Sequence, residues 1–450
     1  MTAAARSRAP IRYGLAAILA IAFVLRVLLF IHSPQPFGYV YDLYHQAIQV
    51  LYNEHRLPDV ADCWVCYHPW LFVQLGFPFY WIGMRVGGDP ETALHVTRLL
   101  PALCELLFIA CGYRLLRIYA RRGWQLLLGF AMLCFFPCSF ISSGGIEADI
   151  LLSALMVGFL VQLVLAFNHR RRMGLETVLL VGLPAGFAAA TKYSGVLALI
   201  VAGEIVVVWW VGRRSRRAAV RYGLPILLVA SLVAAPKYVN NWIKYGNPFQ
   251  GNIVEIGSPL KIKVPWNHYE FHTFRLGDAV DLFRDGAPQG QLTTFDVYRS
   301  FWTTLHTMAW TDMSFFSEPT RHGLPIALYP RRNVPLWLVR AVLVVGIAPS
   351  ALALLGMVVT LRRRSLIPVH LLVATTMLVY VWWIFQLMDW MIKTKYIMFL
   401  YPAYVLYALF GLAYLERTVR WKPARVAAVA FAVVAIALTV LYMYRFAVGA

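Results

Sequence analysis

SSGGIEADILLSALMVGFLVQLVLAFNHRRR, residues 142–172, brings together the features that decide the fold. Glu147 and Asp149 stand near its start, residues 150–167 carry no charge, and three arginines occupy 170–172. An uncharged run of this length can cross the hydrocarbon core of a bilayer as a helix. Because cytoplasmic loops are enriched in Lys and Arg, the three arginines are predicted to lie on the inner side of the membrane. The span between them then places Glu147 and Asp149 on the outer side.

Similar basic clusters recur on alternate connections between apolar stretches. They lie at Arg6/Arg8/Arg12, Arg114/Arg117/Arg121/Arg122, Arg170–Arg172, Arg213/Arg214/Arg216/Arg217, Arg362–Arg364 and Arg417/Arg420/Lys422/Arg425. All of them are predicted to be cytoplasmic. The topology that follows gathers nearly all the carboxylates on the opposite side, so we expect any chemistry at the outer face.

The composition agrees with a polytopic membrane protein. The chain has 450 residues, of which 60% are hydrophobic and only 14% are charged. A net charge of +20 would indicate a nucleic-acid partner in a soluble protein. Here the basic residues lie mostly in short loops between spans, so anionic inner-leaflet lipid is the expected partner and nucleic acid is not. The first span contains Arg26 and is long for a signal peptide, which favours an uncleaved signal anchor.

The pattern predicts an all-α integral membrane fold with about eleven transmembrane helices. They are expected near 13–31, 93–116, 124–141, 147–167, 175–191, 194–212, 218–237, 336–361, 366–388, 395–415 and 425–445. The apolar stretch Trp70–Val86 is also long, but a crossing there would place Arg114–Arg122 outside. We therefore expect it to lie in the outer interface, together with an amphipathic helix over Tyr44–Leu57.

Three regions follow from this layout. Residues 1–238 form an N-terminal transmembrane module whose first outer loop is 32–92, residues 239–335 form a small outer, periplasmic segment, and 336–450 form the C-terminal transmembrane helices. The outer segment is rich in aromatic residues and histidine, which suits contacts with a sugar or peptide acceptor and also suits a small domain on the membrane surface. We expect it to pack on the outer ends of the spans and to cover the site.

The first outer loop offers a candidate general base. Asp42 follows the first span by about ten residues and is flanked by Tyr41 and Tyr44, and His68 begins the approach to the interfacial helix. A carboxylate just above the bilayer is well placed to take a proton from an acceptor hydroxyl. The alternative is an ordinary solvated loop acid.

Glu147 and Asp149 open a span after a glycine break. They are candidates for orienting an acceptor or a metal ion, or for capping the helix, since carboxylates favour a helix N-terminus. Glu105 and Glu204 lie deeper, and we expect them to pair with polar groups of neighbouring spans.

Cys63 and Cys66 lie in the first outer loop at a spacing that permits a disulfide in an oxidising compartment. A zinc site would need two further ligands, for which His45, His55 and His68 are available in the same segment. The disulfide, or simple packing, is the favoured interpretation.

Five segments resemble, in order, the polyprenyl-phosphate-sugar-dependent membrane glycosyltransferases with the C-type fold, the superfamily of protein O-mannosyltransferases and the aminoarabinose transferase of lipid A. They are His68-Pro69 through Arg98-Leu99-Leu100-Pro101, GGIEADILLSAL (144–155), GFAAATKYSGVLAL (186–199), APKYVNNWIKYGNPF (235–249) and KTKYIMFLYPAYVLYAL (393–409). The chain departs from the family pattern at Asn240, where an arginine is usual, and in the neighbours of Asp42, where an Asp-Glu pair is common.

The resemblance implies an inverting glycosyltransferase that moves a sugar from a polyprenyl-phosphate donor to a hydroxyl or amine of a glycan, lipid or protein acceptor. Asp42 would be the catalytic base, with Tyr41, Tyr44, His68, Glu147 and Asp149 lining the site. The donor phosphate would be bound by cations at the outer ends of spans, namely Lys192, Lys395, Arg98 and Lys237. No cofactor is implied with certainty, and a divalent metal stays open.

Two alternatives remain at this point. One is an enzyme like an O-antigen ligase or polymerase, and the other is a transporter of lipid-linked sugars, which would require functional charges near mid-membrane. The Arg- and Ala-rich ends favour a bacterial protein of the inner membrane, with its site on the periplasmic or extracellular side.

Overall fold

In the part that it describes, the computed structural model consists of helices joined by turns and loops, with no β-strand. That part comprises residues 3–32, 44–120, 122–168, 173–211, 216–251, 273–274, 300–311, 334–387, 394–418 and 422–448. Its α-helices are α1 (Ala3–His32), α2 (Tyr44–Glu54), α3 (Leu71–Gly87), α4 (Pro90–Thr97), α5 (Leu99–Tyr119), α6 (Gly123–Cys134), α7 (Pro137–Ser143), α8 (Ala148–Phe167), α9 (Leu175–Thr191), α10 (Val196–Val211), α11 (Arg216–Ala218), α12 (Leu224–Tyr245), α16 (Phe301–Trp310), α17 (Leu336–Val345), α18 (Ile347–Thr360), α19 (Ile367–Leu387), α20 (Tyr401–Thr418) and α21 (Lys422–Val448). Single-turn or otherwise irregular helices are η1 (Tyr193–Gly195), η2 (Ala219–Gly223), η4 (Arg364–Leu366) and η6 (Thr394–Leu400).

The expected all-α membrane architecture is confirmed. Within the described ranges, nine helical segments are long and apolar enough to cross a bilayer, and they match nine of the expected spans. The stretch expected at 124–141 is a pair of helices, α6 and α7, bent by 44°. Pro137 begins α7, and because proline has no backbone N–H it interrupts the helical hydrogen bonding there. The remaining stretch, α9, is a shorter apolar helix of 17 residues.

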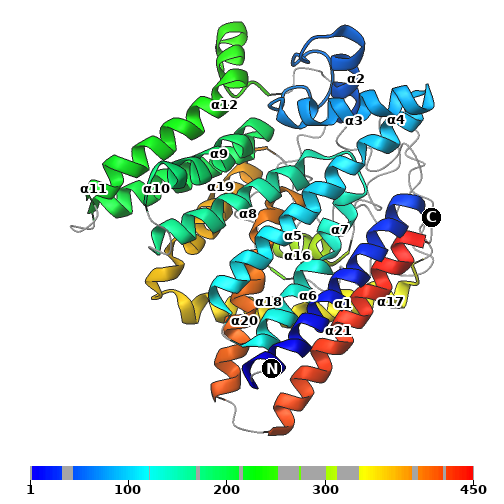
Figure 1. The fold of residues 1–450 in the computed structure, drawn as a ribbon, viewed down its shortest axis with the longest axis vertical. Helices are drawn as coiled ribbons and strands as arrows, with labels where there is room; N and C mark the ends of the chain where they lie inside the picture. Colours follow the sequence, from blue (N-terminus) through cyan, green and yellow to red (C-terminus); the bar gives the residue numbers. More distant parts are fainter. Residues whose placement is uncertain are drawn as a thin grey trace.

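The long helices lie side by side, and α2, α3 and α4 gather at one end of them (Figure 1). The helix α3 runs across that end, and its buried side includes Phe72, Val73 and Tyr80. This is the orientation expected of a helix in the outer interface, and its depth in the membrane stays a prediction. The helix α2, which covers most of the expected amphipathic stretch, packs against α3 through Tyr44, Ala47 and Ile48.

The deep carboxylates pair as expected. Glu105 accepts hydrogen bonds from Arg26 of the first helix at 2.6 and 2.5 Å, and both side chains are buried. Glu204 accepts a hydrogen bond from Thr375 at 2.7 Å. A charge inside a membrane protein is costly unless it is paired, so these contacts tie α1 to α5 and α10 to α19.

The helix α8 is at the centre of the packing. It is buried along most of its length and contacts α5, α7, α9, α10 and α19. It carries almost no amphipathic pattern in sequence, because most of its circumference packs on other helices and only a narrow stripe is partly exposed. Glu147 and Asp149 stand at the N-terminal end of this central helix.

The cysteine interpretation is also confirmed. Cys63 and Cys66 form a disulfide, while Cys104, Cys134 and Cys138 are buried and Cys111 is half-buried. The disulfide lies in the loop between α2 and α3. That loop is held to the end of α12, since Asp59 accepts hydrogen bonds from Lys244 and Tyr245, each at 2.7 Å.

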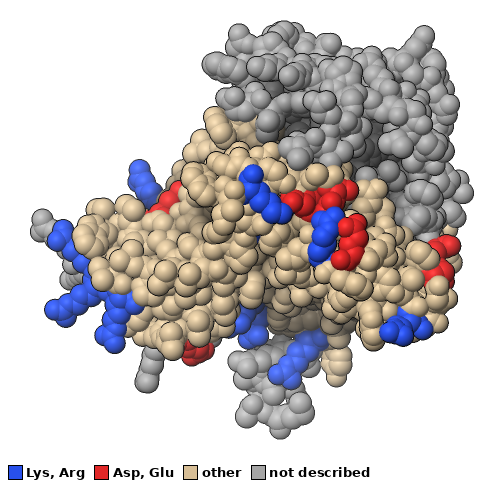
Figure 2. All heavy atoms as spheres, turned by 90° about the horizontal axis from the view of Figure 1, so that it is seen from above, with Lys and Arg blue, Asp and Glu red and all other residues tan. Residues whose placement is uncertain are grey.

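Viewed from the end that carries α2–α4, acidic and basic side chains lie next to one another on the surface (Figure 2). The pairs Asp59–Lys244 and Asp62–Arg56 belong to the first outer loop and its contact with α12. Burial of Asp59 opposes its ionisation, but hydrogen bonds from Lys244, Tyr245 and the Val60 amide outweigh this effect and hold its pKa at about 2. The stabilisation from this contact is therefore fully present above the ordinary pKa of 3.8 and is lost as the pH falls toward 2.

The tight packing of α18 on α20 leads to a test. A Cβ atom at Gly356 would overlap the carbonyl oxygen of Tyr407, and one at Gly411 would overlap that of Leu352. We expect Gly356→Ala and Gly411→Ala each to destabilise the protein by about 1–3 kcal/mol, because neither backbone can move away without unpacking the pair. Thermal unfolding of the purified protein measures the effect. Gly203→Ala in α10 is the matched control, since nothing lies within 4 Å of its Cβ position, and an equal loss there would contradict the explanation.

Candidate functional site

A buried ion pair joins the start of α8 to the end of α9. Lys192 donates hydrogen bonds to both carboxylate oxygens of Asp149, at 2.9 and 3.0 Å. Asp149 is fully buried and Lys192 is 7% exposed. Such a pair is stable only when its geometry satisfies both charges, because each ion has lost most of its hydration. Lys192 thus neither snorkels to the headgroups nor stands alone.

A second pair lies beside it. Lys395 of η6 donates a hydrogen bond to Glu147 at 3.0 Å, and Glu147 is 1% exposed. The ring of Tyr396 lies near both ammonium groups, with its centroid 4.5 Å from Nζ of Lys192 and 5.9 Å from Nζ of Lys395. Two lysines, two carboxylates and one tyrosine, from three segments far apart in sequence, therefore form one cluster, which we call the α8 charge cluster.

Local backbone geometry explains how these side chains meet. The helix α7 ends at Ser143 with Gly144 as its C-cap, and Glu147 takes the extended conformation before α8 begins at Ala148. At the end of α9, Lys192 is extended, with φ −156° and ψ 151°, so its side chain leaves the helical path toward α8. The next turn packs closely, since a Cβ atom at Gly195 would overlap the carbonyl oxygen of Ala188.

The capping interpretation needs a correction. Glu147 occupies the N-cap position of α8, but its side chain makes no capping hydrogen bond. The carboxylate turns to Lys395 instead, because a buried charge gains more from an ammonium partner than from a backbone amide. Asp149 lies in the first turn, where the helix dipole also favours its negative charge.

Arg98 contacts the loop between α7 and α8, which carries Glu147. Its Nε donates to the carbonyl oxygen of Gly144 at 2.8 Å, and one terminal nitrogen lies 3.4 Å from the carbonyl oxygen of Leu29. Its guanidinium also lies over the ring of Phe30, 5.1 Å from the centroid. Arg98 is thus next to the loop that carries Glu147, and it ties that loop to the end of α1.

Lys237 is in a different environment. It is 2% exposed, donates a hydrogen bond to the carbonyl oxygen of Cys66 at 3.1 Å, and lies 4.7 Å from the ring of Trp70. The structure records no ion pair of Lys237 with a carboxylate of the described residues. It holds the disulfide loop against α12, so its expected contact with a donor phosphate stays a prediction.

His68 and Tyr44 lie near each other. The two rings are stacked at 6.1 Å, and His68 is also 5.8 Å from the ring of Tyr193, the residue after Lys192. Tyr41 and the expected base, Asp42, lie outside the described residues. The last described residue before them is His32, and Tyr44 resumes the chain at the start of α2.

Sequence reasoning missed Tyr193 and Tyr396. The signal was present, because Thr-Lys-Tyr occurs twice, at 191–193 and at 394–396, and each copy supplies a lysine of the cluster. Part of the outer segment also lies nearby. The helix α16 packs on η6 and α7, and Thr394 donates a hydrogen bond to the carbonyl oxygen of Leu305 at 2.7 Å.

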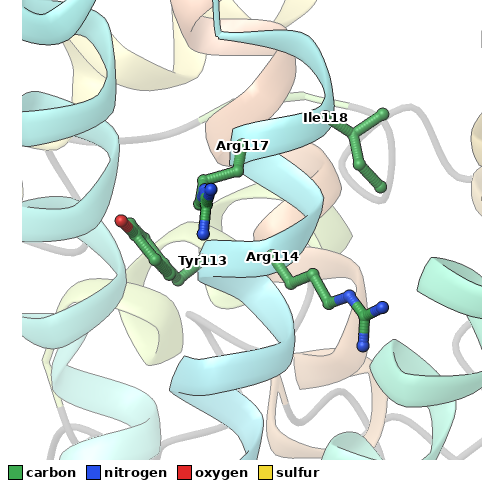
Figure 3. Close-up of a pocket in the computed structure, with 4 residues that line it drawn as sticks. All are labelled: Tyr113, Arg114, Arg117 and Ile118. Carbon is green, nitrogen blue, oxygen red and sulfur yellow. The ribbon is translucent and has the colours of Figure 1, made fainter.

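A metal site does not follow from the described residues. Among them, no group of three or more His, Cys, Asp or Glu side chains is gathered so as to hold an ion. An open hollow of about 540 Å³ lies elsewhere, at the end of α5 that carries the second basic cluster, and is lined by Tyr113, Arg114, Arg117 and Ile118 (Figure 3). The residues of the α8 charge cluster take no part in it.

Comparisons with known proteins identify the fold. No protein-family model matches the sequence, and no curated protein sequence matches it. Among solved structures, the Archaeoglobus fulgidus oligosaccharyltransferase in complex with Zn and sulfate is similar over 95% of this chain and 53% of its own, with a TM-score of 0.54 and 15% identity. The archaeal oligosaccharyltransferase AglB from Archaeoglobus fulgidus, in complex with an inhibitory peptide and a dolichol-phosphate, gives a TM-score of 0.50 at 16% identity, over 97% of this chain and 56% of its own.

The chain has the C-type glycosyltransferase fold. It spans about half the length of the oligosaccharyltransferase structures that it matches. ArnT from Cupriavidus metallidurans bound to undecaprenyl phosphate is similar over 90% of this chain and 77% of its own, at 15% identity, but with a TM-score of 0.40 this likeness carries no conclusion. The family resemblance seen in five sequence segments is thus confirmed for the fold.

The Asp149–Lys192 pair gives a stability test. We expect Asp149→Asn to destabilise the protein by about 3–5 kcal/mol, because it leaves a buried ammonium without its counter-charge. The double variant Asp149→Asn with Lys192→Met removes both charges and should recover much of the loss. Thermal unfolding in one detergent measures both, with Glu54→Gln at the exposed Glu54–Arg56 pair as the control. A double variant as unstable as Asp149→Asn would argue against the pairing.

Proposed function

We propose that the protein is an inverting membrane glycosyltransferase that transfers a sugar from a polyprenyl-phosphate donor to an acceptor hydroxyl or amine at the outer face of the membrane. The observation that carries the proposal is the α8 charge cluster, in which Lys192 and Lys395 both lie near the ring of Tyr396 within a C-type glycosyltransferase fold. The dolichol-phosphate named for AglB supports a lipid phosphate as the donor's leaving group.

The two lysines suit the phosphate. Each ammonium is held by a buried carboxylate, so its position is fixed before the donor arrives. The phosphate gains negative charge as the bond to the sugar breaks, and preorganised cations lower the barrier most where charge develops in the transition state. Lys395 is the more exposed of the two, at 14% against 8% of its side chain, which favours it as the first contact.

The chemical step is a single displacement. Asp42 takes the proton of the acceptor hydroxyl, the acceptor oxygen bonds to the anomeric carbon, and the bond from that carbon to the phosphate oxygen breaks on the opposite face. The configuration at the anomeric carbon is thereby inverted, and the products are the glycosylated acceptor and free polyprenyl phosphate. Arg98 is proposed to hold the loop of Glu147, and His68 and Tyr44 to line the acceptor side. No step is assigned to a metal.

The transporter alternative is less well supported. It requires working charges near mid-membrane, but Glu105 is neutralised by Arg26 and Glu204 is bonded to Thr375. An O-antigen ligase or polymerase would use a diphosphate-linked donor. The test below separates the two donor classes.

Release of free polyprenyl phosphate from a panel of polyprenyl-phosphate-sugars tests the proposal. We expect wild-type protein to release it with at least one donor in the presence of an acceptor extract. Asp42→Asn should lose about 100-fold or more of this rate, since general base catalysis is worth that much. Lys395→Met should also lower the rate, whereas Lys244→Met, at an exposed lysine, should not.

Full activity of Asp42→Asn would show that Asp42 is not the catalytic base, but it would not contradict the proposed class of donor. Release from diphosphate-linked donors alone would favour the ligase or polymerase alternative. No release from any donor by folded protein would argue against a transferase.

A further inference from the structure

A cluster of aromatic rings adjoins the α8 charge cluster. Tyr193 lies at its centre, with ring centroids 5.7 Å from Tyr238, 5.7 Å from Phe249 and 6.1 Å from Tyr67. Tyr238 and Phe249 are 5.4 Å apart. The three tyrosines are half-buried and Phe249 is 51% exposed, so the cluster opens to the surface. We call these four residues the Tyr193 platform.

The platform is rigidly built. The hydroxyl of Tyr193 donates to the carbonyl oxygen of Gln250 at 2.9 Å and accepts a hydrogen bond from the amide of Asn241 at 2.8 Å. The hydroxyl of Tyr238 donates to the carbonyl oxygen of Ala189 at 3.0 Å. The end of α9, the end of α12 and the turn after it, residues 246–251, are therefore fixed to one another. Because Tyr193 follows Lys192 directly, the platform is fixed to the charge cluster as well.

The platform also has hydrogen-bonding capacity that the described protein does not use. Oδ1 of Asn241 and Oγ of Ser194 are both buried, and neither has a hydrogen-bond partner among the described residues. Buried polar atoms are nearly always paired in native proteins. Two such atoms beside Tyr193 leave hydrogen-bonding capacity for a polar partner other than the described residues.

We propose that the Tyr193 platform binds the acceptor and that the acceptor is a carbohydrate. This inference rests on the proposed function and names its acceptor class. The face of an aromatic ring carries a partial negative charge and attracts the weakly positive C–H bonds on the face of a sugar ring. The hydroxyls of the same sugar supply the donors and acceptors that Asn241 and Ser194 lack.

A carbohydrate fits these features better than a peptide does. A peptide that docks on a protein surface usually needs a groove, a free sheet edge or charged pockets. The platform instead offers tyrosine and phenylalanine rings tilted at 45–74° to one another, with uncharged hydrogen-bonding groups. Its place directly after Lys192 puts the acceptor beside the proposed site of the donor phosphate.

Phe249→Ala tests the platform without touching the proposed catalytic residues. We expect the acceptor KM to rise about two- to tenfold for a glycan acceptor, the value of one aromatic contact, with little change in kcat or in the donor KM. Tyr193→Phe keeps the ring and should have a smaller effect. The matched control is Trp242→Ala, at an aromatic residue of α12 that is 61% exposed and outside the platform.

Two further readouts separate this inference from the proposed function. Slow release of polyprenyl phosphate to water needs no acceptor, so Phe249→Ala should leave it unchanged while glycan transfer falls. Binding of methyl glycosides and disaccharides of glucose, galactose and mannose to the purified full-length chain needs no turnover, and we expect it to be weakened by Phe249→Ala and not by Trp242→Ala.

Several results would overturn the inference. They are an unchanged acceptor KM and unchanged glycoside binding in Phe249→Ala, a change confined to the donor KM, or transfer to peptide acceptors and to no glycan. If wild-type protein releases no polyprenyl phosphate but still binds glycosides through Phe249, the platform stands and the proposed function fails.

Discussion

The rest of the candidate site depends on two ion pairs at the start of α8, one buried and one partly exposed at Lys395. Three of the four charges, those of Asp149, Glu147 and Lys192, are buried, and the cost of burying them is offset because each carboxylate meets an ammonium at hydrogen-bond distance. Satisfying both pairs fixes the position of α9 and η6 relative to α8. The pairs thus define the geometry of the site as well as its charge.

Other residues near the N-terminal end of α8 are arranged around the α8 charge cluster. Arg98 holds the loop before α8, and Tyr396 lies against both lysines. The extended backbone of Lys192 that allows the pairing also turns Tyr193 toward the end of α12. Donor and acceptor functions are thereby proposed for neighbouring residues of one short motif, Thr191-Lys192-Tyr193 and the turn that follows it.

Much of the fold could be predicted from the sequence, because it depends on the lengths and positions of uncharged runs. Uncharged runs set the helices, so nine spans were found, and the bent pair overlaps one expected stretch; the direction of the spans stays a prediction. A polar partner for Glu105 was expected from the cost of a lone charge among apolar helices, and the structure identifies that partner as Arg26.

The site was predicted less completely, because its contacts join residues that are distant in sequence. Lys192 and Asp149 are 43 positions apart, and Lys395 and Glu147 are 248 apart, so no local pattern indicates either pair. The four cations looked equivalent in sequence. Their contacts in the folded chain differ. Lys237 donates a hydrogen bond to the Cys66 carbonyl, whereas the ammonium groups of Lys192 and Lys395 both lie near the ring of Tyr396.

The most direct measurement is an electron cryomicroscopy structure of the full-length chain with bound polyprenyl phosphate. The account predicts that the phosphate lies within hydrogen-bond distance of Nζ of Lys192 or Lys395, beside Tyr396. A phosphate bound away from both lysines, with the two ion pairs intact, would contradict the proposed role of the α8 charge cluster.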